Sequence, residues 1–173
     1  NPATKSSGGL YNKLFSLNGV RDGGYSLEKR TWSKGDYMVL NIPTYRTTLK
    51  EAIDKGYEIL EKHGLSKIDY IVDDKLKEFR GSQYLNVRPR NKVEREQARI
   101  KAEKEALEKK DEREAYEEYQ LELLTEEENA LKGLTQGEID FINRIEETSP
   151  ILAQQVLDGL VPFDVAYDIV RNG

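Results

Sequence analysis

The sequence predicts a mainly α-helical chain with a minor β element, an α+β fold in three parts. A small N-terminal mixed region comes first, then a long charged helix, then a C-terminal bundle of short helices. Of the 173 residues, 37 % are hydrophobic and 34 % are charged, which is polar for one globule. Residues 91–132 contain no proline and no glycine, and residues 125–173 hold several helix-capping signals.

The net charge of −5 hides an asymmetry along the chain. Through Lys92 there are 17 Lys and Arg against 11 Asp and Glu, and from Val93 onward there are 10 against 21. A basic part and an acidic part can pair within the chain or with neighbours in an assembly. The alternative is that the like charges only form a solvated face.

Composition excludes several classes of protein. With no cysteine there are no disulfides, no Cys-based zinc sites and no thiol catalysis. No window approaches the roughly 18 apolar residues of a membrane helix, so we expect no membrane span. The sequence begins at Asn1 without methionine and no signal-like segment follows, which we interpret as trimming or as processing of the natural N-terminus.

Residues 1–36 are rich in Gly, Ser, Asn and Lys and predict an irregular arm. The Asn18-Gly19 and Asp22-Gly23 steps are turn signals. Aromatic and aliphatic side chains lie between them, including Tyr11 and Phe15, and a disordered tail would be poorer in such residues. We therefore expect Tyr11 and Phe15 to contact the chain itself or a neighbouring protein, with a floppy leader as the alternative.

Residues 37–90 predict a small mixed region. The run 37–42 is β-favouring and ends before Pro43, and Thr48 with Glu51 forms a capping box that opens a helix ending at Gly64. Apolar residues at helical spacing favour a second helix over 66–80, although 68–72 alone could be a strand. Residues 83–87 read as extended, and Pro89 separates them from the next helix.

The segment 91–124 predicts one long charged helix that acts as a spacer, with Asn91 as its N-cap. Its apolar positions Val93, Ile100, Leu107 and Leu121 lie seven or fourteen residues apart, which is too sparse for a coiled coil. Opposite charges four residues apart stabilise such a helix in water. The pattern becomes more apolar near its end, so we expect this end to contact a partner or the C-terminal module. The residues concerned are Tyr116, Tyr119, Leu123 and Leu124.

Residues 125–173 predict a module of short helices near 126–133, 136–147, 150–158 and 162–171. The boundaries come from capping boxes at Thr125 and Thr135, from Ser149-Pro150, from Gly159 and from Pro162. A module this small buries a modest fraction of its surface, so we expect it to lean on another element or another protein. Ile142 and Leu157 are its candidate interface residues.

The sequence offers little for catalysis. The one histidine, His63, precedes Gly64 at a predicted helix end, where a positive charge suits the helix dipole. No phosphate-binding loop, nucleophile elbow or calcium loop occurs. We expect no enzymatic activity, no metal, no cofactor and no small-molecule substrate.

We therefore predict a non-enzymatic structural or assembly subunit that bridges its protein neighbours in a larger complex, for example a virion or an organellar assembly. The alternative is a nucleic-acid-associated adaptor, because cations and aromatics mix in the basic part. A third class is a regulatory protein that binds a partner through the acidic helix. The basic part contains Lys29, Arg30, Lys34, Arg46, Lys50, Arg88, Arg90 and Lys92 together with Tyr25, Trp32, Tyr45 and Tyr84. Arg88, Arg90, Lys92, Lys34 and Arg46 are the candidate nucleic-acid contacts.

Overall fold

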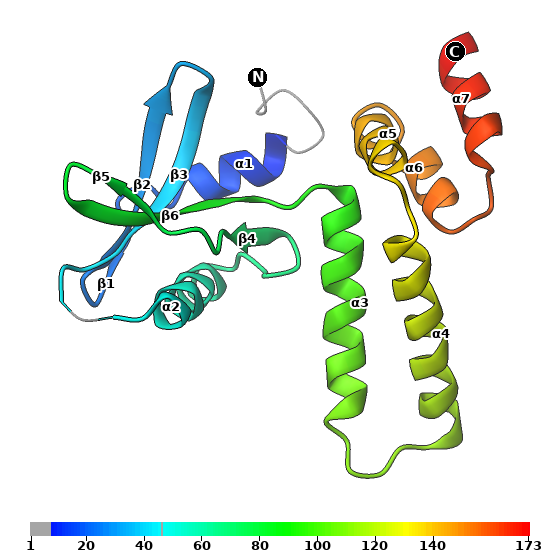
Figure 1. Ribbon diagram of the computed structural model, residues 1–173, viewed down its shortest axis with the longest axis horizontal. Coiled ribbons are helices and arrows are strands. Elements are labelled where there is room, and N and C mark those ends of the chain that lie inside the picture. The colour runs from blue at the N-terminus through cyan, green and yellow to red at the C-terminus, as the bar shows by residue number, and fades with distance from the viewer. Residues whose placement is uncertain (1–7, 46) are drawn as a thin grey trace. The chain divides into compact units, whose positions relative to one another are not determined.

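The computed structural model describes residues 8–45 and 47–173 of the chain (Figure 1). It divides into two compact units, residues 1–90 and residues 91–173, which we call the sheet unit and the helical unit. Each unit has a core of its own.

The sheet unit is built on one six-stranded antiparallel sheet. The strand order is β1-β2-β3-β6-β4, and β5 also pairs with β6. The last strand in sequence, β6, therefore lies inside the sheet, with β3 on one side and both β4 and β5 on the other. The strands are β1 (Arg21–Asp22), β2 (Tyr25–Trp32), β3 (Gly35–Asn41), β4 (Tyr70–Val72), β5 (Lys77–Phe79) and β6 (Ser82–Pro89).

One face of this sheet carries the core. The register places Leu27, Leu40 and Leu85 side by side on β2, β3 and β6, and all three are buried. Two helices supply the other half of the core, α1 (Gly8–Phe15) with Leu14 and α2 (Leu49–Lys62) with Ile59 and Leu60. Because strand side chains alternate, every second residue points to the opposite face, which these core contacts leave free.

Two contacts fix the helices on the sheet. Gly56 lets α2 approach closely, because a Cβ at this position would lie 2.9 Å from Cγ2 of Val72 and 3.2 Å from Cδ2 of Leu40. The Tyr70 hydroxyl donates a 2.7 Å hydrogen bond to the carbonyl of Leu10 in α1. Burial, with a contribution from the charge of Asp69, raises the pKa of Tyr70 to about 12, so the hydroxyl keeps its proton even where a free tyrosine begins to ionise.

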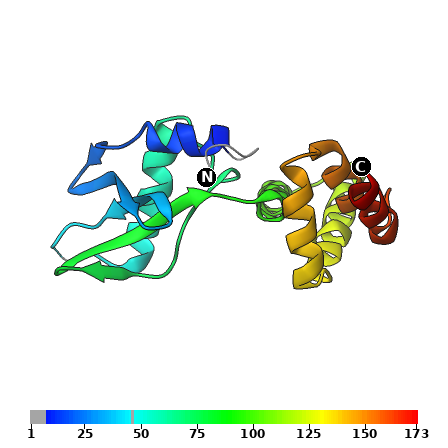
Figure 2. The ribbon, with the colours of Figure 1, turned by 90° about the horizontal axis from the view of Figure 1, so that it is seen from above.

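The helical unit consists of a helical hairpin followed by three shorter helices. In the hairpin, α3 (Lys92–Glu108) and α4 (Ala115–Lys132) pack side by side (Figures 1 and 2; α3 is seen end-on in Figure 2). The shorter helices α5 (Gln136–Glu146), α6 (Pro150–Leu157) and α7 (Phe163–Asn172) follow. Among the described residues, no helix combines the length and the apolar character needed to cross a bilayer.

The predicted fold class is wrong in its β content and in its long helix. The β structure is a six-stranded sheet rather than a minor element. The segment expected as an irregular arm, within 1–36, forms α1, β1, β2 and the start of β3 over its described residues. The helix expected over 66–80 is instead β4 and β5, because both segments pair with β6 and long-range pairing overrides a local apolar spacing.

The charged helix expected over 91–124 breaks at residues 109–114 and folds back on itself. On the side that faces the other helix, each carries one apolar position per heptad, and the two sets meet: Ile100 of α3 lies in one buried cluster with Leu124 and Leu131 of α4, and Leu107 packs against it. One apolar residue per heptad is too few for a coiled coil between two chains, but it is sufficient to hold the two helices of a hairpin together. Leu121, expected on the same seam, is only half-buried.

Several local predictions are confirmed. The strand over 37–42 is β3, the extended segment 83–87 is β6, and α2, α3, α5 and α6 begin at their predicted caps. Gly159 follows α6 with a φ of 75°, as a helix-ending glycine does. The capping box at Thr125 is wrong: this residue lies inside α4, and its hydroxyl donates to the carbonyl of Leu121 at 2.9 Å.

Candidate functional site

The most distinctive surface of the sheet unit is the side of the sheet that faces away from α1 and α2. We call it the outer face. It consists of alternate residues of β2 from Ser26 to Trp32, of β3 from Tyr37 to Asn41 and of β6 from Tyr84 to Arg88, together with Lys77 and Phe79 of β5. Four of its side chains are aromatic, which is unusual for a surface that no other described element of the unit covers.

Arg30 occupies the middle of the outer face. Its Nε donates to Oε1 of Glu28 at 2.7 Å and its Nη2 donates to Oδ1 of Asn41 at 2.9 Å. Its guanidinium carbon lies 4.6 Å from the centre of the Tyr84 ring, within the range of a cation–π contact. The face therefore already holds one cation over an aromatic ring, and Val39 is fully buried in the same surface.

Two hairpin turns place aromatic side chains at opposite ends of the outer face. Trp32 precedes the β2–β3 turn and is 62 % exposed, and Phe79 precedes the β5–β6 turn and is 47 % exposed. The second turn consists of Arg80 and Gly81, both with positive φ, 52° and 81°. Among the described residues Arg80 is the only non-glycine with positive φ, and its guanidinium carbon lies 5.1 Å from the centre of the Phe79 ring.

An open depression of about 660 Å³ joins these groups, from Trp32 on β2 to Phe79 on β5. Lys34 and Lys77 line it, and neither has an ion-pair partner within residues 8–45 and 47–173, whereas Lys29 lies 3.8 Å from Asp36. Asn86 also lines the depression, and its Oδ1 is buried with no hydrogen-bond donor in the described part of the chain. The depression thus combines rings, lysines without an ion-pair partner among the described residues and one side-chain amide oxygen without a hydrogen bond there.

The predicted nucleic-acid residues do not form one group. Arg88 belongs to the outer face and Lys34 lies in the β2–β3 turn that borders it. Arg90 instead holds the sheet unit together, since its Nε donates to the Lys67 carbonyl at 2.9 Å. Lys92 lies in the helical unit, where its Nζ bonds to Oε1 of Gln154 at 2.6 Å. Arg46 lies outside the described residues.

The predicted interface residues of the helical unit separate into two groups. Leu124 and Ile142 are buried in the unit's own clusters, and Leu157 packs against both clusters as a half-buried side chain. Tyr116, Tyr119 and Leu123 are exposed, at 69 %, 62 % and 39 %. Their spacing of three and four residues puts them on one side of α4, and we call them the α4 stripe.

The two candidates on α1 are half-buried. Tyr11 and Phe15 contact each other with ring centres 5.6 Å apart, and Nζ of Lys29 lies 5.7 Å from the centre of the Phe15 ring. Phe15 also packs against the core of the sheet unit. Both side chains are therefore engaged within their own unit, and each keeps part of its surface exposed.

The last helix, α7, has apolar residues on two sides. On the inner side Ala166 is buried, and the rings of Phe163 and Tyr167 lie 6.3 Å and 4.1 Å from that of Phe141 in α5. On the outer side Val165 and Ile169 are 45 % and 49 % exposed. At about 100° per residue, the apolar positions span about 200° of the helix, twice the width that one buried face requires.

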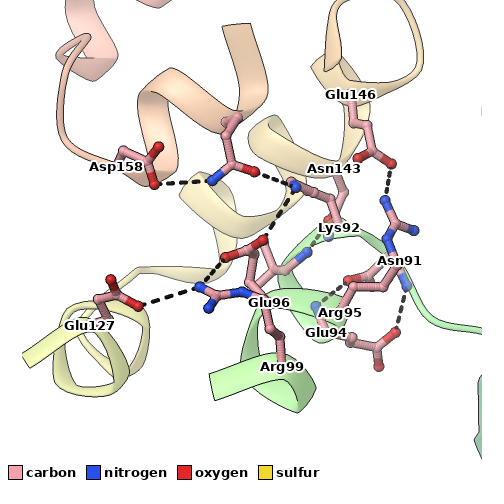
Figure 3. A network of polar contacts seen from close by, with 12 residues as sticks. Asn91, Lys92, Glu94, Arg95, Glu96, Arg99, Glu127, Asn143, Glu146 and Asp158 are labelled. Atoms are coloured by element: carbon pink, nitrogen blue, oxygen red, sulfur yellow. Dashed lines mark hydrogen bonds and ion pairs between the residues drawn. The ribbon is translucent and has the colours of Figure 1, made fainter. Parts of the chain in front are cut away.

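A polar network fixes the first turns of α3 against its neighbours (Figure 3). The side chain of Asn143 in α5 accepts the backbone N–H of Val93 at 3.1 Å, and Arg95 pairs with Glu146. Arg99 binds Glu96 and reaches Glu127 of α4 at 3.3 Å. Burial lowers the pKa of Arg99, but Glu96 and Glu103 outweigh that effect and raise it. These contacts keep the hairpin and the short helices together.

A second ion pair closes the loop end of the hairpin. Glu117 is buried, pairs with Lys110, and accepts the backbone N–H of Glu114 at 3.1 Å. The hydrogen bond from Lys110 holds the pKa of Glu117 below its usual value, and the carboxylate raises that of Lys110. Glu117, Leu124 and Leu131 are seven residues apart, so the buried carboxylate occupies the loop end of the hairpin seam.

The sequence did not predict that Tyr37, Lys77 and Phe79 lie on one exposed face of a sheet. Lys77 and Phe79 fell within a segment interpreted as helix, where they could not be assigned to a sheet. The signal that could have placed them is the alternation Lys77, Phe79 before Arg80-Gly81 and Tyr84, Asn86 after it, which is typical of a tight hairpin.

The described residues contain no group of three or more side chains arranged to hold a metal ion. Nδ1 of His63 lies 2.9 Å from the carbonyl oxygen of Ile59, so this ring is engaged at the end of α2. No family model matches the chain, and neither a curated protein nor a solved structure matches it.

Proposed function

We propose that the chain is a non-enzymatic assembly subunit that binds neighbouring proteins through its helical unit. The observation that supports this most is the outer side of α7. Val165 and Ile169 lie opposite the side that packs on Phe141, and no other described element covers them. A helix with an apolar surface this wide gains stability when a second apolar surface covers it.

The α4 stripe provides a second surface for the same purpose. Tyrosine is enriched in protein interfaces, because it combines a large apolar ring with a hydrogen-bonding hydroxyl. The stripe begins at Tyr116, at the loop end of the hairpin, whereas α7 follows α6 and α5 beyond the other end of α4 (Figure 1). The 18 residues of α4 span about 27 Å at ~1.5 Å per residue, so two neighbours can bind without overlapping.

Charge selects the kind of partner. From Val93 onward the chain has 10 Lys and Arg against 21 Asp and Glu, and Asp164 and Asp168 lie on the polar side of α7. A second copy of this unit would bring like charges together, which disfavours association. The partner we propose for α7 is a different protein, with an apolar groove bordered by Lys and Arg.

The test is purification of the tagged chain from its natural source, with quantitative mass spectrometry of the proteins that accompany it. The variant Val165→Asp/Ile169→Asp should lose a defined partner at least tenfold, because two carboxylates would then face an apolar groove. The control is Asp164→Asn/Asp168→Asn, which changes the same helix by two residues but leaves the apolar side intact. It should weaken binding of the partner only several-fold, because exposed ion pairs with the Lys and Arg of the groove contribute up to about 1 kcal/mol.

The bridging role has its own test. Tyr116→Lys/Tyr119→Lys should lose a different neighbour from the one lost by the α7 variant, and circular dichroism should show both variants folded. Recovery of the wild-type chain as a lone monomer, or only with nuclease-sensitive material, would contradict the assembly proposal. Loss of the same neighbour from both variants would contradict bridging.

A further inference from the structure

We propose that the outer face of the sheet unit binds single-stranded nucleic acid, with bases stacked on its aromatic rings and phosphates held by its unpaired lysines. This site lies in the sheet unit and is independent of the assembly surfaces of the helical unit. It also differs from the set of Arg88, Arg90 and Lys92 that the sequence suggested, since only Arg88 of these three belongs to the face.

The rings lie on the surface of the sheet rather than in its core, and Arg30 already lies over one of them, Tyr84. Trp32 and Phe79 are exposed at the two ends of the face, and Tyr37 and Tyr84 are half-buried between them. In the strand register, Trp32 pairs with Gly35 of β3, which lies six positions from Asn41. Phe79 lies two positions beyond the Tyr84–Asn41 pair in the other direction. Trp32 and Phe79 are therefore eight positions apart along the strands, up to about 27 Å. This length suits several consecutive bases and exceeds a single nucleotide.

The cations beside the rings are available for phosphates. Glu28 is paired with Arg30, and Asp36 accepts a hydrogen bond from Thr31 at 2.8 Å, so each carboxylate of the depression already has a partner. Lys34 and Lys77 line the depression and have no ion-pair partner among the described residues. Aromatic rings next to free cations are the arrangement by which proteins bind single strands without sequence preference.

The conformation of Arg80 supports a binding role. A tight turn with two positive φ values strongly prefers Asn-Gly or Gly-Gly, and an arginine there is strained. The turn places the Arg80 guanidinium beside Phe79 at the end of the face, where this group can reach a phosphate or stack on a base. A sequence selected only for a stable turn would have another residue at this position.

The face favours unpaired bases over a duplex. Rings that project from a sheet need the flat side of a base, which a duplex keeps covered by its neighbours. An acidic peptide could use the lysines but offers few planar groups for four rings. Its binding is therefore an outcome that the experiment must distinguish.

Trp32 makes the experiment direct, because it is the one tryptophan of the chain. A mixed-sequence 12-nucleotide RNA and its DNA counterpart are titrated into the full chain while tryptophan fluorescence is recorded. Stacking of a base on Trp32 should quench the fluorescence, and a labelled oligonucleotide should show a matching rise in anisotropy. Unequal affinity of the RNA and the DNA would show which of the two is the preferred strand.

Matched variants distinguish binding at the outer face from nonspecific attraction to lysines elsewhere on the chain. Phe79→Ala should weaken binding by about 5- to 150-fold, the effect of losing one stacked base, whereas Ile151→Ala at an exposed position of α6 should not change it. Lys34→Gln/Lys77→Gln should lower the slope of log affinity against log salt by about 1.4, since each lysine contributes ~0.7 on a single strand. Lys50→Gln on α2, away from the face, should leave that slope unchanged.

Three outcomes would overturn the proposal. The first is no quenching at oligonucleotide concentrations up to about 100 μM at low salt, where even nonspecific nucleic-acid binding is detectable. The second is equal weakening by Lys50→Gln and by the face variants. The third is full displacement of the oligonucleotide by polyglutamate of equal charge, which would indicate a site for acidic peptide. None of these results bears on the helical unit, so this proposal and the assembly proposal fail separately.

Discussion

At the scale of single residues, replacing the turn residue Arg80 should change the stability of the fold and its oligonucleotide binding in opposite directions. Asn at this position should raise the free energy of unfolding by about 0.5–1 kcal/mol, because relief of a strained positive φ, about 1–3 kcal/mol, exceeds an exposed cation–π contact worth about 0.5–1 kcal/mol. The same Arg80→Asn change should weaken oligonucleotide binding. Urea unfolding and anisotropy measure the two effects, and a fall in stability would show that the turn is not strained.

Gly56 is a residue whose role is visible only in the structure. Gly56→Ala should lower the free energy of unfolding by about 1 kcal/mol, since overpacking against Val72 and Leu40 costs about 1–3 kcal/mol and helix propensity returns about 1 kcal/mol. Gly137→Ala in α5 is the control, because its Cβ would meet only Oγ1 of Thr135, at 3.9 Å. Thermal unfolding compares them, and an equal or higher melting temperature for Gly56→Ala would refute the close approach.

The candidate site was partly predictable at this scale. Arg30, Lys34, Trp32 and Tyr84 belong to the basic and aromatic set that the sequence identifies, so their chemistry was recognised. Their common face was not, because it depends on which residues lie opposite each other in the strand pairs. Arg80 also concealed the second hairpin, since an arginine gives no signal for a turn that needs positive φ.

At the scale of elements, the hairpin and the sheet depend on ionised carboxylates. Lys110 lowers the pKa of Glu117, Lys104 that of Glu128, and Lys55 with Lys62 that of Asp22. A carboxyl group with a lowered pKa stabilises the fold above its unfolded pKa, near 4, and loses that contribution as the pH falls through its folded pKa. We therefore expect the melting temperature to fall as the pH drops below about 4.

Glu117→Gln tests the origin of this acid sensitivity. The variant should be less stable than the wild type at pH 7 and should lose less of its stability on acidification, because one of the titrating pairs is gone. Glu112→Gln in the same loop is the control, since Glu112 is exposed and has no ion-pair partner among the described residues. Identical acid profiles for Glu117→Gln and the wild type would show that the pair with Lys110 contributes nothing.

Elements marked by local chemistry were predictable, and those defined by long-range pairing were not. Thr48, Asn91, Thr135 and Ser149 cap helices where the sequence indicated, because a cap involves only residues three positions apart. The break at 109–114 contains neither glycine nor proline, so no local signal marks it. It forms because Leu107 and Ile100 gain apolar contacts with Leu124 and Leu131 when the chain folds back.

At the scale of the whole chain, the two units should unfold in separate transitions, because each has its own core. Ile59→Val in the sheet unit and Ile142→Val in the helical unit remove one methyl from equally buried positions. Each should cost about 0.5–1.5 kcal/mol and lower one calorimetric transition by several degrees, about 4–8 °C per kcal/mol, without moving the other. A single transition that both variants shift would contradict independence.

The position of β6 inside the sheet has a consequence for synthesis of the chain. Neither β4 nor β5 can pair until residues 82–89 have left the ribosome, and β3 has only one of its two neighbours until then. The hydrophobic side chains of β3, including Met38 and Leu40, therefore remain incompletely covered until about half of the chain has been made. Contacts between such distant segments form slowly, and the exposed intermediate is the state that a chaperone or an aggregate would bind first.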